Sequence, residues 1–264
     1  TEFHPNPADP NGSEFIELAN VSSQAINLRG ASFTEGIEFR FPETRDTPLA
    51  PGQRLLLVSD LFQFQRRHGI DIPVAGIFNG RLNNAGEPVT LVNTTGEAVF
   101  HFTYKGGFPW PTEADGGGYS LVLARPELGL NNPAAWRISS LPEGNPGADD
   151  RLRFTGAPET DVDQDGVAAL LEYALGTRDD DPASGAGAAL GDLGVDPQAN
   201  LSFARQAGAD DIDVWVEFSP DLIEWKVANR MTARPTGTGM IEETWGASSL
   251  GEPSIFLRLR VALR

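Results

Sequence analysis

In the stretch Ile255-Phe256-Leu257-Arg258-Leu259-Arg260-Val261, every second residue is a large aliphatic one, and two of the residues between them are arginines. Side chains alternate between the two faces of a strand, so this period predicts a strand with one buried and one solvated face. Four more short apolar runs precede it, at residues 201–205, 212–218, 223–228 and 240–245. Residues 199–264 are therefore predicted to form a small C-terminal β unit, which either folds as a domain of its own or docks on the β region that precedes it.

The first 150 residues show a longer succession of the same kind of run. Strands are predicted at residues 14–18, 36–41, 54–58, 87–92, 98–104 and 119–124, with turn formers such as Pro51-Gly52 and Asn79-Gly80 between them. One helix interrupts them at residues 61–68, with Asp60 as its N-cap and Gly69 as its stop. Short strands at this spacing predict a β-sandwich over residues 1–150.

The composition excludes several classes of function and of binding site. The chain carries 20 basic and 37 acidic residues, a net charge of −17, and such a surface repels the phosphate backbone of nucleic acids. The absence of cysteine excludes disulfides, thiol nucleophiles and Cys-type zinc sites. No apolar run approaches the roughly 18 residues of a membrane span. The sequence starts at Thr1 without a signal peptide, so we expect a piece of a longer secreted precursor.

A linker at residues 151–198 contains the motif with the most chemistry, Asp161-Val162-Asp163-Gln164-Asp165-Gly166-Val167-Ala168-Ala169-Leu170-Leu171-Glu172. Calcium takes six to eight hard oxygens, and a twelve-residue loop can wrap them around the ion. Its ligand positions one, three, five, seven and twelve are Asp161, Asp163, Asp165, the Val167 carbonyl and Glu172. Gly166 allows the sharp turn at position six. Ala169 at position nine has no side-chain oxygen, so we expect water there.

The loop is expected to act as a structural clip. Strong helix formers run from Ala168 to Leu175, and Gly176 ends them, whereas Gly156 and Pro158 exclude an entering helix. A loop with only its exit helix suits the weak calcium affinities of extracellular modules, roughly 10⁻⁴–10⁻³ M, better than cytosolic sensing. The alternative is an acidic turn that binds nothing.

Other candidate sites are weaker. The acidic clusters 179–181 and Asp210, Asp211 and Asp213 are either solvated loops or a second cation site. No metal spacing relates His4, His68 and His101, and no serine lies in a nucleophile elbow, so no catalytic residue is assigned. Trp110, between two prolines, either stacks on a sugar ring or plugs one end of the sandwich.

Short motifs, in order over the first 140 residues or so, resemble the bacterial extracellular form of the lamin-tail domain. They are Glu2-Phe3-His4-Pro5-Asn6-Pro7, residues 14–18, 27–30, 36–42, 49–52, 80–87, 109–111, 114–116, 120–121 and 136–137. Pro5 departs from the tyrosine that bacterial members often carry. The resemblance implies an immunoglobulin-like sandwich without conserved catalytic residues. It also implies an interaction module of large secreted or surface proteins.

Residues 161–264 resemble a C-terminal region of exported bacterial proteins, in which a calcium loop and a Leu-Leu-Glu-Tyr-Ala-Leu-Gly helix precede a small β unit. Here these are residues 161–166 and 170–176, followed by the stretches 218–225 and 256–261. The loop resembles that of EF-hands, and its missing first helix resembles dockerins. A dockerin would duplicate the loop and this chain does not, so cohesin binding is not expected.

Together these features predict an all-β chain: an immunoglobulin-like β-sandwich, an EF-hand-like calcium loop with one short helix, and a second small β domain. We expect a non-catalytic, calcium-stabilised, extracellular interaction module of a larger secreted or cell-surface protein. Ca²⁺ is expected to fix the junction between the two β regions. The expected partner is a protein or a cell-surface polysaccharide. The alternatives are a carbohydrate-binding accessory region of a secreted hydrolase, with Trp110 as its platform, and an enzyme in its own right.

Overall fold

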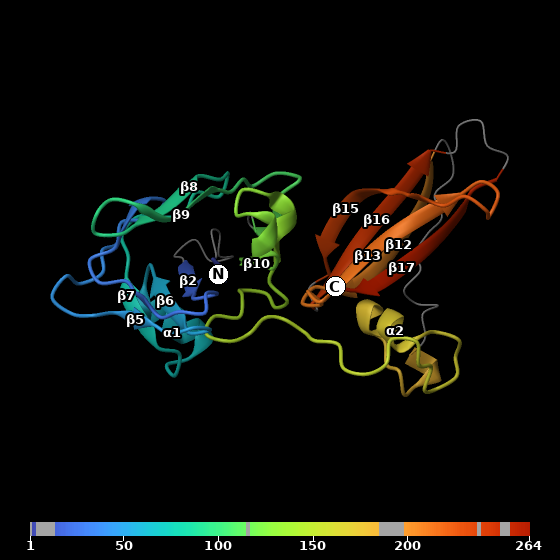
Figure 1. Cartoon of the computed structure of the whole chain (residues 1–264), viewed down its shortest axis with the longest axis horizontal. Helices are drawn as coiled ribbons and strands as arrows, with labels where there is room; N and C mark the ends of the chain where they lie inside the picture. Colours follow the sequence, from blue (N-terminus) through green and yellow to red (C-terminus); the bar gives the residue numbers. More distant parts are fainter. Residues whose placement is uncertain (1, 4–13, 115–116, 185–197, 237–238, 249–253) are drawn as a thin grey trace. The chain divides into compact units, whose positions relative to one another are not determined.

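The computed structural model describes residues 2–3, 14–114, 117–184, 198–236, 239–248 and 254–264. Two expected features, the motif at residues 2–7 and the linker at residues 151–198, lie partly outside these ranges. The described chain is mostly β, as the sequence predicts (Figure 1). It divides into two compact units, Thr1–Asp150 and Arg151–Arg264.

The first unit contains a six-stranded sheet in the order β11-β10-β1-β2-β6-β7. Its strands are β1 (Glu2–Phe3), β2 (Phe15–Ala19), β6 (Arg54–Val58), β7 (Val74–Ile77), β10 (Leu121–Leu123) and β11 (Trp136–Ile138). Neighbouring strands are antiparallel except β6 and β7, which are parallel and connected through α1 (Leu61–His68).

Two smaller sheets complete this unit. One has the order β4-β8-β9, and the other pairs β3 with β5. Their bounds are β3 (Ile26–Asn27), β4 (Ser32–Glu35), β5 (Pro48–Leu49), β8 (Pro88–Val92) and β9 (Ala98–Thr103). Residues of the six-stranded sheet (Ile16, Leu57) and of the three-stranded sheet (Phe33, Leu91, Phe102) share one hydrophobic core. The two sheets therefore pack face to face, as in a sandwich.

The helix α1 covers the other face of the six-stranded sheet. Its bounds and caps agree with the sequence prediction: the Asp60 carboxylate accepts a hydrogen bond from the Gln63 amide at 2.9 Å, and Gly69 has φ 90°. Fully buried Phe64 packs with Phe15 and Val58 in a second cluster. The strand β6 thus has apolar neighbours on both faces, which explains its continuous apolar run.

The second unit consists of two three-stranded antiparallel sheets, β12-β16-β15 and β14-β13-β17, and the helix α2 (Ala169–Leu175). The strands are β12 (Gln198–Gln206), β13 (Ile212–Ser219), β14 (Lys226–Val227), β15 (Asn229–Pro235), β16 (Met240–Ser248) and β17 (Phe256–Leu263). The two sheets and α2 share a core that includes Leu201, Val216 and Leu175. In β17, Arg258 and Arg260 are exposed and the alternate leucines are half-buried, as the alternation predicts.

Two strand predictions are wrong in part. Residues 36–41 form only isolated bridges, although Ile37 and Phe41 do lie in the core as expected. The run 223–228 contributes only the two residues of β14. The Asp221 carboxylate accepts hydrogen bonds from the amides of Ile223 (2.8 Å) and Glu224 (3.0 Å). These bonds hold residues 221–224, which precede β14, in a turn.

Candidate metal centre

The acidic loop is closed by its own flanks. The Thr160 carbonyl accepts a hydrogen bond from the Ala169 amide at 2.7 Å, and the Pro158 carbonyl accepts one from Leu170 at 3.2 Å. The segment before Asp161 contains no helix, as Gly156 and Pro158 predict. These two bonds place the start of the loop beside the first turn of α2.

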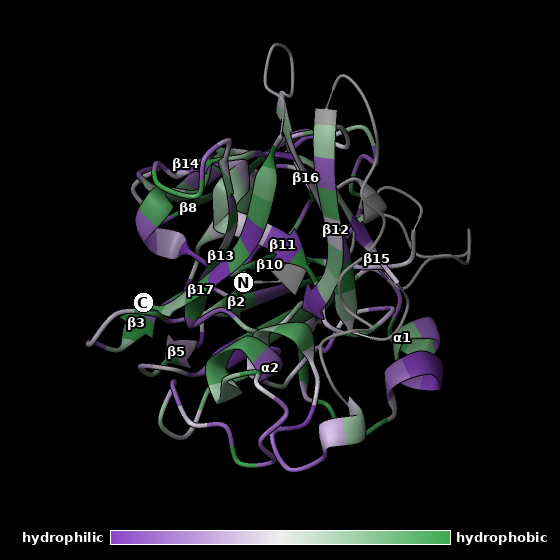
Figure 2. Ribbon diagram, turned by 90° about the vertical axis from the view of Figure 1, so that its right-hand side faces the viewer, coloured by the Kyte–Doolittle hydropathy of each residue, from purple (hydrophilic) through white to green (hydrophobic). Residues whose placement is uncertain are grey.

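The helix α2 is packed onto the second unit. Its apolar residues are the green part of this ribbon in Figure 2. Leu170 and Ala174 share a cluster with Ala209 and Ile212, while Leu175 joins the core between the sheets. Gly176 ends the helix in the left-handed conformation, with φ 73°. The backbone of Glu172, in the middle of α2, is therefore held firmly to the β-sheets.

Polar contacts add to this anchoring of α2. The Gln206 side chain donates a hydrogen bond to the Tyr173 carbonyl at 2.7 Å, and the Tyr173 hydroxyl donates one to Asp211 at 2.8 Å. Burial, together with the Asp211 carboxylate, raises the pKa of Tyr173 well above its usual value, so the hydroxyl stays protonated and keeps donating.

Three aspartates converge in the loop. Asp161, Asp163 and Asp165 each present a carboxylate oxygen within 4.8 Å of the other two. Each also accepts one loop amide: Asp161 from Gly166 (3.0 Å), Asp163 from Asp165 (3.1 Å) and Asp165 from Val167 (2.8 Å). The left-handed φ of 92° at Gly166 permits this turn. One oxygen of each carboxylate therefore orders the loop.

Glu172 is the fourth acid of the site. Its side chain is 0% exposed, and within the described chain neither of its carboxylate oxygens has a hydrogen-bond partner. The second oxygen of Asp163 is likewise buried without a partner. Burial raises the pKa of Glu172, the nearby Thr177 side chain lowers it, and the charges of Asp163, Asp165 and Asp179 raise it further. The Thr177 hydroxyl itself donates to the backbone carbonyl of Glu172, at 3.4 Å. A buried carboxylate in such surroundings is costly unless a cation compensates it.

The donor set fits calcium. The three aspartates offer hard carboxylate oxygens, with no imidazole or thiolate among them, and this favours Ca²⁺ over zinc or copper. Glu172, the twelfth position of the loop, is not in the group of three carboxylates that lie within 4.8 Å of one another. The Val167 amide donates a hydrogen bond to Asp165. The Val167 carbonyl, at position seven of the loop, is the backbone oxygen that the sequence assigns to the ion. Ala169 at position nine is buried and has no side-chain oxygen.

The neighbouring acidic residues do not form a separate cluster in the described chain. Asp179 turns to the loop and accepts the Val162 amide at 3.3 Å, whereas exposed Asp180 pairs with Arg178. Asp181 accepts the Ala183 amide at 3.1 Å, at the start of the short 3₁₀ helix η4 (Pro182–Ser184).

The later acidic cluster is also engaged within the protein. Asp211 accepts hydrogen bonds from the Phe154 amide and the Tyr173 hydroxyl, and Asp213 pairs with Arg264 at 3.0 Å. These contacts tie the start of the second unit, its helix and its last strand together. Among the described residues, neither cluster gathers three acidic groups close enough to share a metal ion, and a second cation site there stays one of the two alternatives.

Trp110 is part of the first unit's core. It is 5% exposed, and its ring lies 6.0 Å from that of Trp136, centroid to centroid. A ring in this position cannot stack on a sugar, so Trp110 plugs the core. The carbohydrate-binding alternative loses the residue on which it depended.

The histidines described by the structure do not form a catalytic relay, and His4 lies outside the described residues. Burial beside Phe15 and Phe64, together with the charge of Arg67, lowers the pKa of His68 to about 4. This ring is therefore a neutral core residue at pH 7.

His101 belongs to a polar cluster that the sequence pattern did not reveal. The pairing of β4, β8 and β9 aligns Glu35 with Thr90 and Thr90 with His101. The Thr90 oxygen lies 2.6 Å from His101 Nδ1 and 2.5 Å from Glu35 Oε2. In a nucleophile–base relay the carboxylate holds the other histidine nitrogen. Here both groups meet the same hydroxyl, so this cluster lacks the relay.

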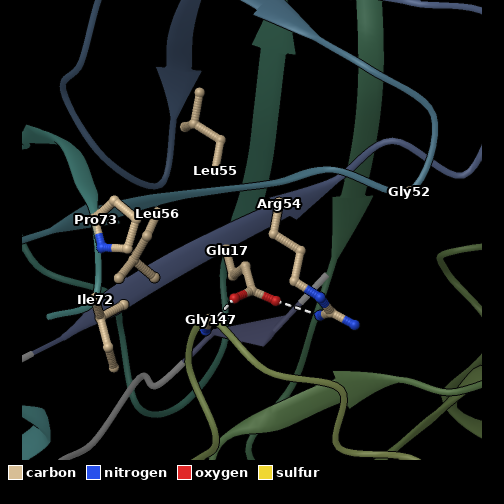
Figure 3. A pocket seen from close by; sticks show the side chains of 8 residues that line it. All are labelled: Glu17, Gly52, Arg54, Leu55, Leu56, Ile72, Pro73 and Gly147. Carbon is tan, nitrogen blue, oxygen red and sulfur yellow. Dashed lines mark hydrogen bonds and ion pairs between the residues drawn. The ribbon is translucent and has the colours of Figure 1, made fainter.

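A cavity of about 370 Å³ lies beside β2 and β6 (Figure 3). Fully buried Glu17 lines it, and both of its carboxylate oxygens are bonded: one to Arg54 Nη1 at 2.5 Å, the other to the Gly147 amide at 2.6 Å. Arg54 also faces Asp149 at 3.5 Å. The charged side chains that line this cavity are already paired with each other. Their bonds to Gly147 and Asp149 attach residues 147–149 to the sheet.

The comparison with protein families identifies the first part of the chain. The Lamin Tail Domain family matches residues 1–106, a shorter span than the motifs suggest. Neither a curated protein nor a solved structure matches the chain. In the described part, no helix is long and apolar enough to cross a membrane. Residues 1–106 are thus a lamin tail domain, the immunoglobulin-like part of this mostly β chain.

Proposed function

We propose that the chain is a non-catalytic interaction module of a larger secreted or cell-surface protein, stabilised by one calcium ion. The ion is held by the carboxylates of Asp161, Asp163, Asp165 and Glu172 and by the carbonyl of Val167. Calcium supplies positive charge and ordered coordination here, and the loop residues supply the oxygens.

The observation that carries this proposal is the state of Glu172. Exposed aspartates in a turn are common without a cation, but a fully buried glutamate without a partner is not. Its position on α2 is imposed by the packing of Leu170 and Leu175. The fold therefore keeps an acidic group in a place where a bound cation would make its burial favourable.

Calcium acts here as a clip within the second unit. It links the acidic loop to α2, which is already packed on the β-sheets. Loops of extracellular modules bind calcium at roughly 10⁻⁴–10⁻³ M, so the clip is filled where calcium is millimolar, outside the cell. That calcium also fixes the junction between the two units remains a prediction from the sequence.

The interaction role rests on the lamin tail domain and on the chemistry of the described residues. The polar clusters at Thr90 and Glu17 are internally paired, and neither presents an activated nucleophile. The proposed partner is a protein or a cell-surface polysaccharide. A screen of the full chain on hydrolase substrates should give no turnover, and turnover would contradict the non-catalytic assignment.

The calcium clip is tested by thermal unfolding of the full chain in calcium and in EGTA. Wild type should unfold at a higher temperature in calcium than in EGTA. At a calcium concentration of 100 times the dissociation constant, the free energy of unfolding should rise by about 2.7 kcal/mol. Asp163→Ala should lose this difference, because it removes a ligand. The matched control is Asp180→Asn, which changes an exposed acid of the same region and should retain the response. Equal midpoints in calcium and EGTA for wild type would refute the clip.

A further inference from the structure

The chain after α2 returns to the calcium loop. Gly176 reverses its direction with a φ of 73°, and the Thr177 amide donates to the Glu172 carbonyl at 3.0 Å. Two residues later, Asp179 Oδ1 accepts the amide of Val162, the residue between the first two loop aspartates, at 3.3 Å. A carboxylate from outside the twelve-residue loop therefore lies against its entrance.

Asp179 also acts on the buried acid of the site by its charge. It raises the pKa of Glu172, together with Asp163 and Asp165. It thus contacts the loop at Val162 and interacts electrostatically with Glu172 in the helix. Among the described residues, Asp180 and Asp181 contact Arg178 and Ala183 instead, so this position is particular to Asp179 within the acidic run.

The loop itself is short of one donor. Position nine is Ala169, which is buried and has no side-chain oxygen, while calcium takes six to eight oxygens. A carboxylate has two oxygens, and Val162 occupies only Oδ1 of Asp179. We propose that Asp179 is a fifth carboxylate ligand of the calcium ion, supplying through Oδ2 the oxygen that Ala169 lacks. This assignment rests on the proposed calcium site and adds to it a ligand from outside the loop.

The added carboxylate has two physical consequences. Calcium affinity depends on the number of charged ligands, so a fifth carboxylate strengthens binding relative to the loop alone. It also takes the place of a bound water. Because Asp179 follows the end of α2, binding orders residues 177–179 together with the loop, and the ion holds both ends of the helix.

The test uses the full chain with Ca²⁺ and with Tb³⁺, whose luminescence lifetimes in H₂O and D₂O report the number of bound waters. The key variant is Asp179→Asn, which retains an oxygen for the Val162 amide but loses the charge. It should weaken calcium binding by about tenfold. It should also add about one water to bound Tb³⁺, because one ligand position opens. The control Asp180→Asn should match wild type in both readouts.

Three other outcomes would overturn either the assignment of Asp179 or the calcium site itself. An unchanged affinity and water number in Asp179→Asn would overturn the ligand assignment while leaving the loop site intact. A weaker affinity with an unchanged water number would also overturn it, since Asp179 would then only support the turn at Val162. If wild type binds neither ion, the calcium site itself fails, and the proposed function fails with it.

Discussion

Glu172 and Glu14 are both buried acids, but their surroundings give them different roles. The carboxylate of Glu172 has no hydrogen-bond partner in the described chain, and the charges of other carboxylates act on it, as we expect for the proposed calcium ligand. Glu14 accepts the Leu82 amide at 3.0 Å, and burial raises its pKa to about 7. One bond and protonation near neutral pH make Glu14 tolerable without a cation.

At Glu172, removal of the charge should affect the two calcium states in opposite directions. Glu172→Gln should raise the unfolding midpoint in EGTA, because it removes an uncompensated buried charge. The same change should abolish the stabilisation by calcium, because a ligand is lost. Calorimetry in EGTA and in calcium checks both effects, with exposed Glu224→Gln as the control. A variant with the full calcium response would contradict the role of Glu172.

At Glu14, the raised pKa makes stability depend on pH. The folded-state pKa of about 7 lies above the ordinary glutamate pKa of 4.5, so below pH 4.5 both the folded and the unfolded state are protonated and there is no penalty. As pH rises from 4.5 through 7, the unfolded state loses its proton first and folding becomes less favourable.

The variant Glu14→Gln removes this penalty and keeps an acceptor for the Leu82 amide. The rise of the Glu14 pKa from 4.5 to about 7 corresponds to about 3 kcal/mol. The variant should therefore match wild type at pH 4 and exceed its stability by up to about 3 kcal/mol at pH 8. Urea unfolding at the two pH values measures the difference. The idea is wrong if the two proteins differ equally at both.

Among the elements, the two helices show how far local sequence defines structure. The helix α1 has a capping aspartate, a body and a stop glycine, and all three lie where the sequence predicts. The helix α2 has no side-chain cap at Ala168, and it depends on Gly176 and on packing. Its C-terminal turn is therefore a sensitive position.

Substitution of Gly176 should destabilise the second unit. An alanine there would adopt φ near +73°, and its Cβ would meet Met240 Cε at 2.9 Å. We expect Gly176→Ala to cost about 1–3 kcal/mol in urea unfolding. The control Gly96→Ala also has a positive φ, 83°, but open space around it, so it should cost less. Equal costs would show that the contact with Met240 does not matter.

Strand prediction succeeds where apolar residues report burial and fails where they do not. The run 54–58 corresponds to β6 without error because both of its faces are covered. The strand β15 was missed because most of its residues are polar and exposed, and it lies at the edge of its sheet. Its pairing with β16 comes from the backbone, which leaves no periodic signal in side chains.

At the scale of the whole molecule, the family match ends earlier in the chain than the first compact unit does. The Lamin Tail Domain match ends at residue 106, but β10 and β11 pair into the same six-stranded sheet as β1 and β2. The buried pair of Arg137 and Asp150, 2.6 Å apart, holds the end of this unit. The first unit therefore continues to Asp150 in its sheets and ion pairs.

Calcium should protect one unit and leave the other unchanged. Hydrogen exchange of the full chain should be slower in calcium for the amides of residues 161–177, up to about a hundredfold at 100 times the dissociation constant. The amides of β2, β6 and β8 should exchange at the same rates with and without calcium, because their unit contains none of the proposed ligands. Mass spectrometry of peptic fragments measures both. Equal protection of both units would contradict a local clip.

The sequence by itself determined the β class, both helices and the spacing of the loop acids, because these depend on residues near one another in the chain. Only the tertiary structure decided which side chains are covered and which distant ones meet. It buried Trp110 and Glu172, aligned Thr90 with His101, and brought Asp179 to Val162. Such contacts depend on strand register and on the packing of separate segments, and neither leaves a local pattern in the sequence.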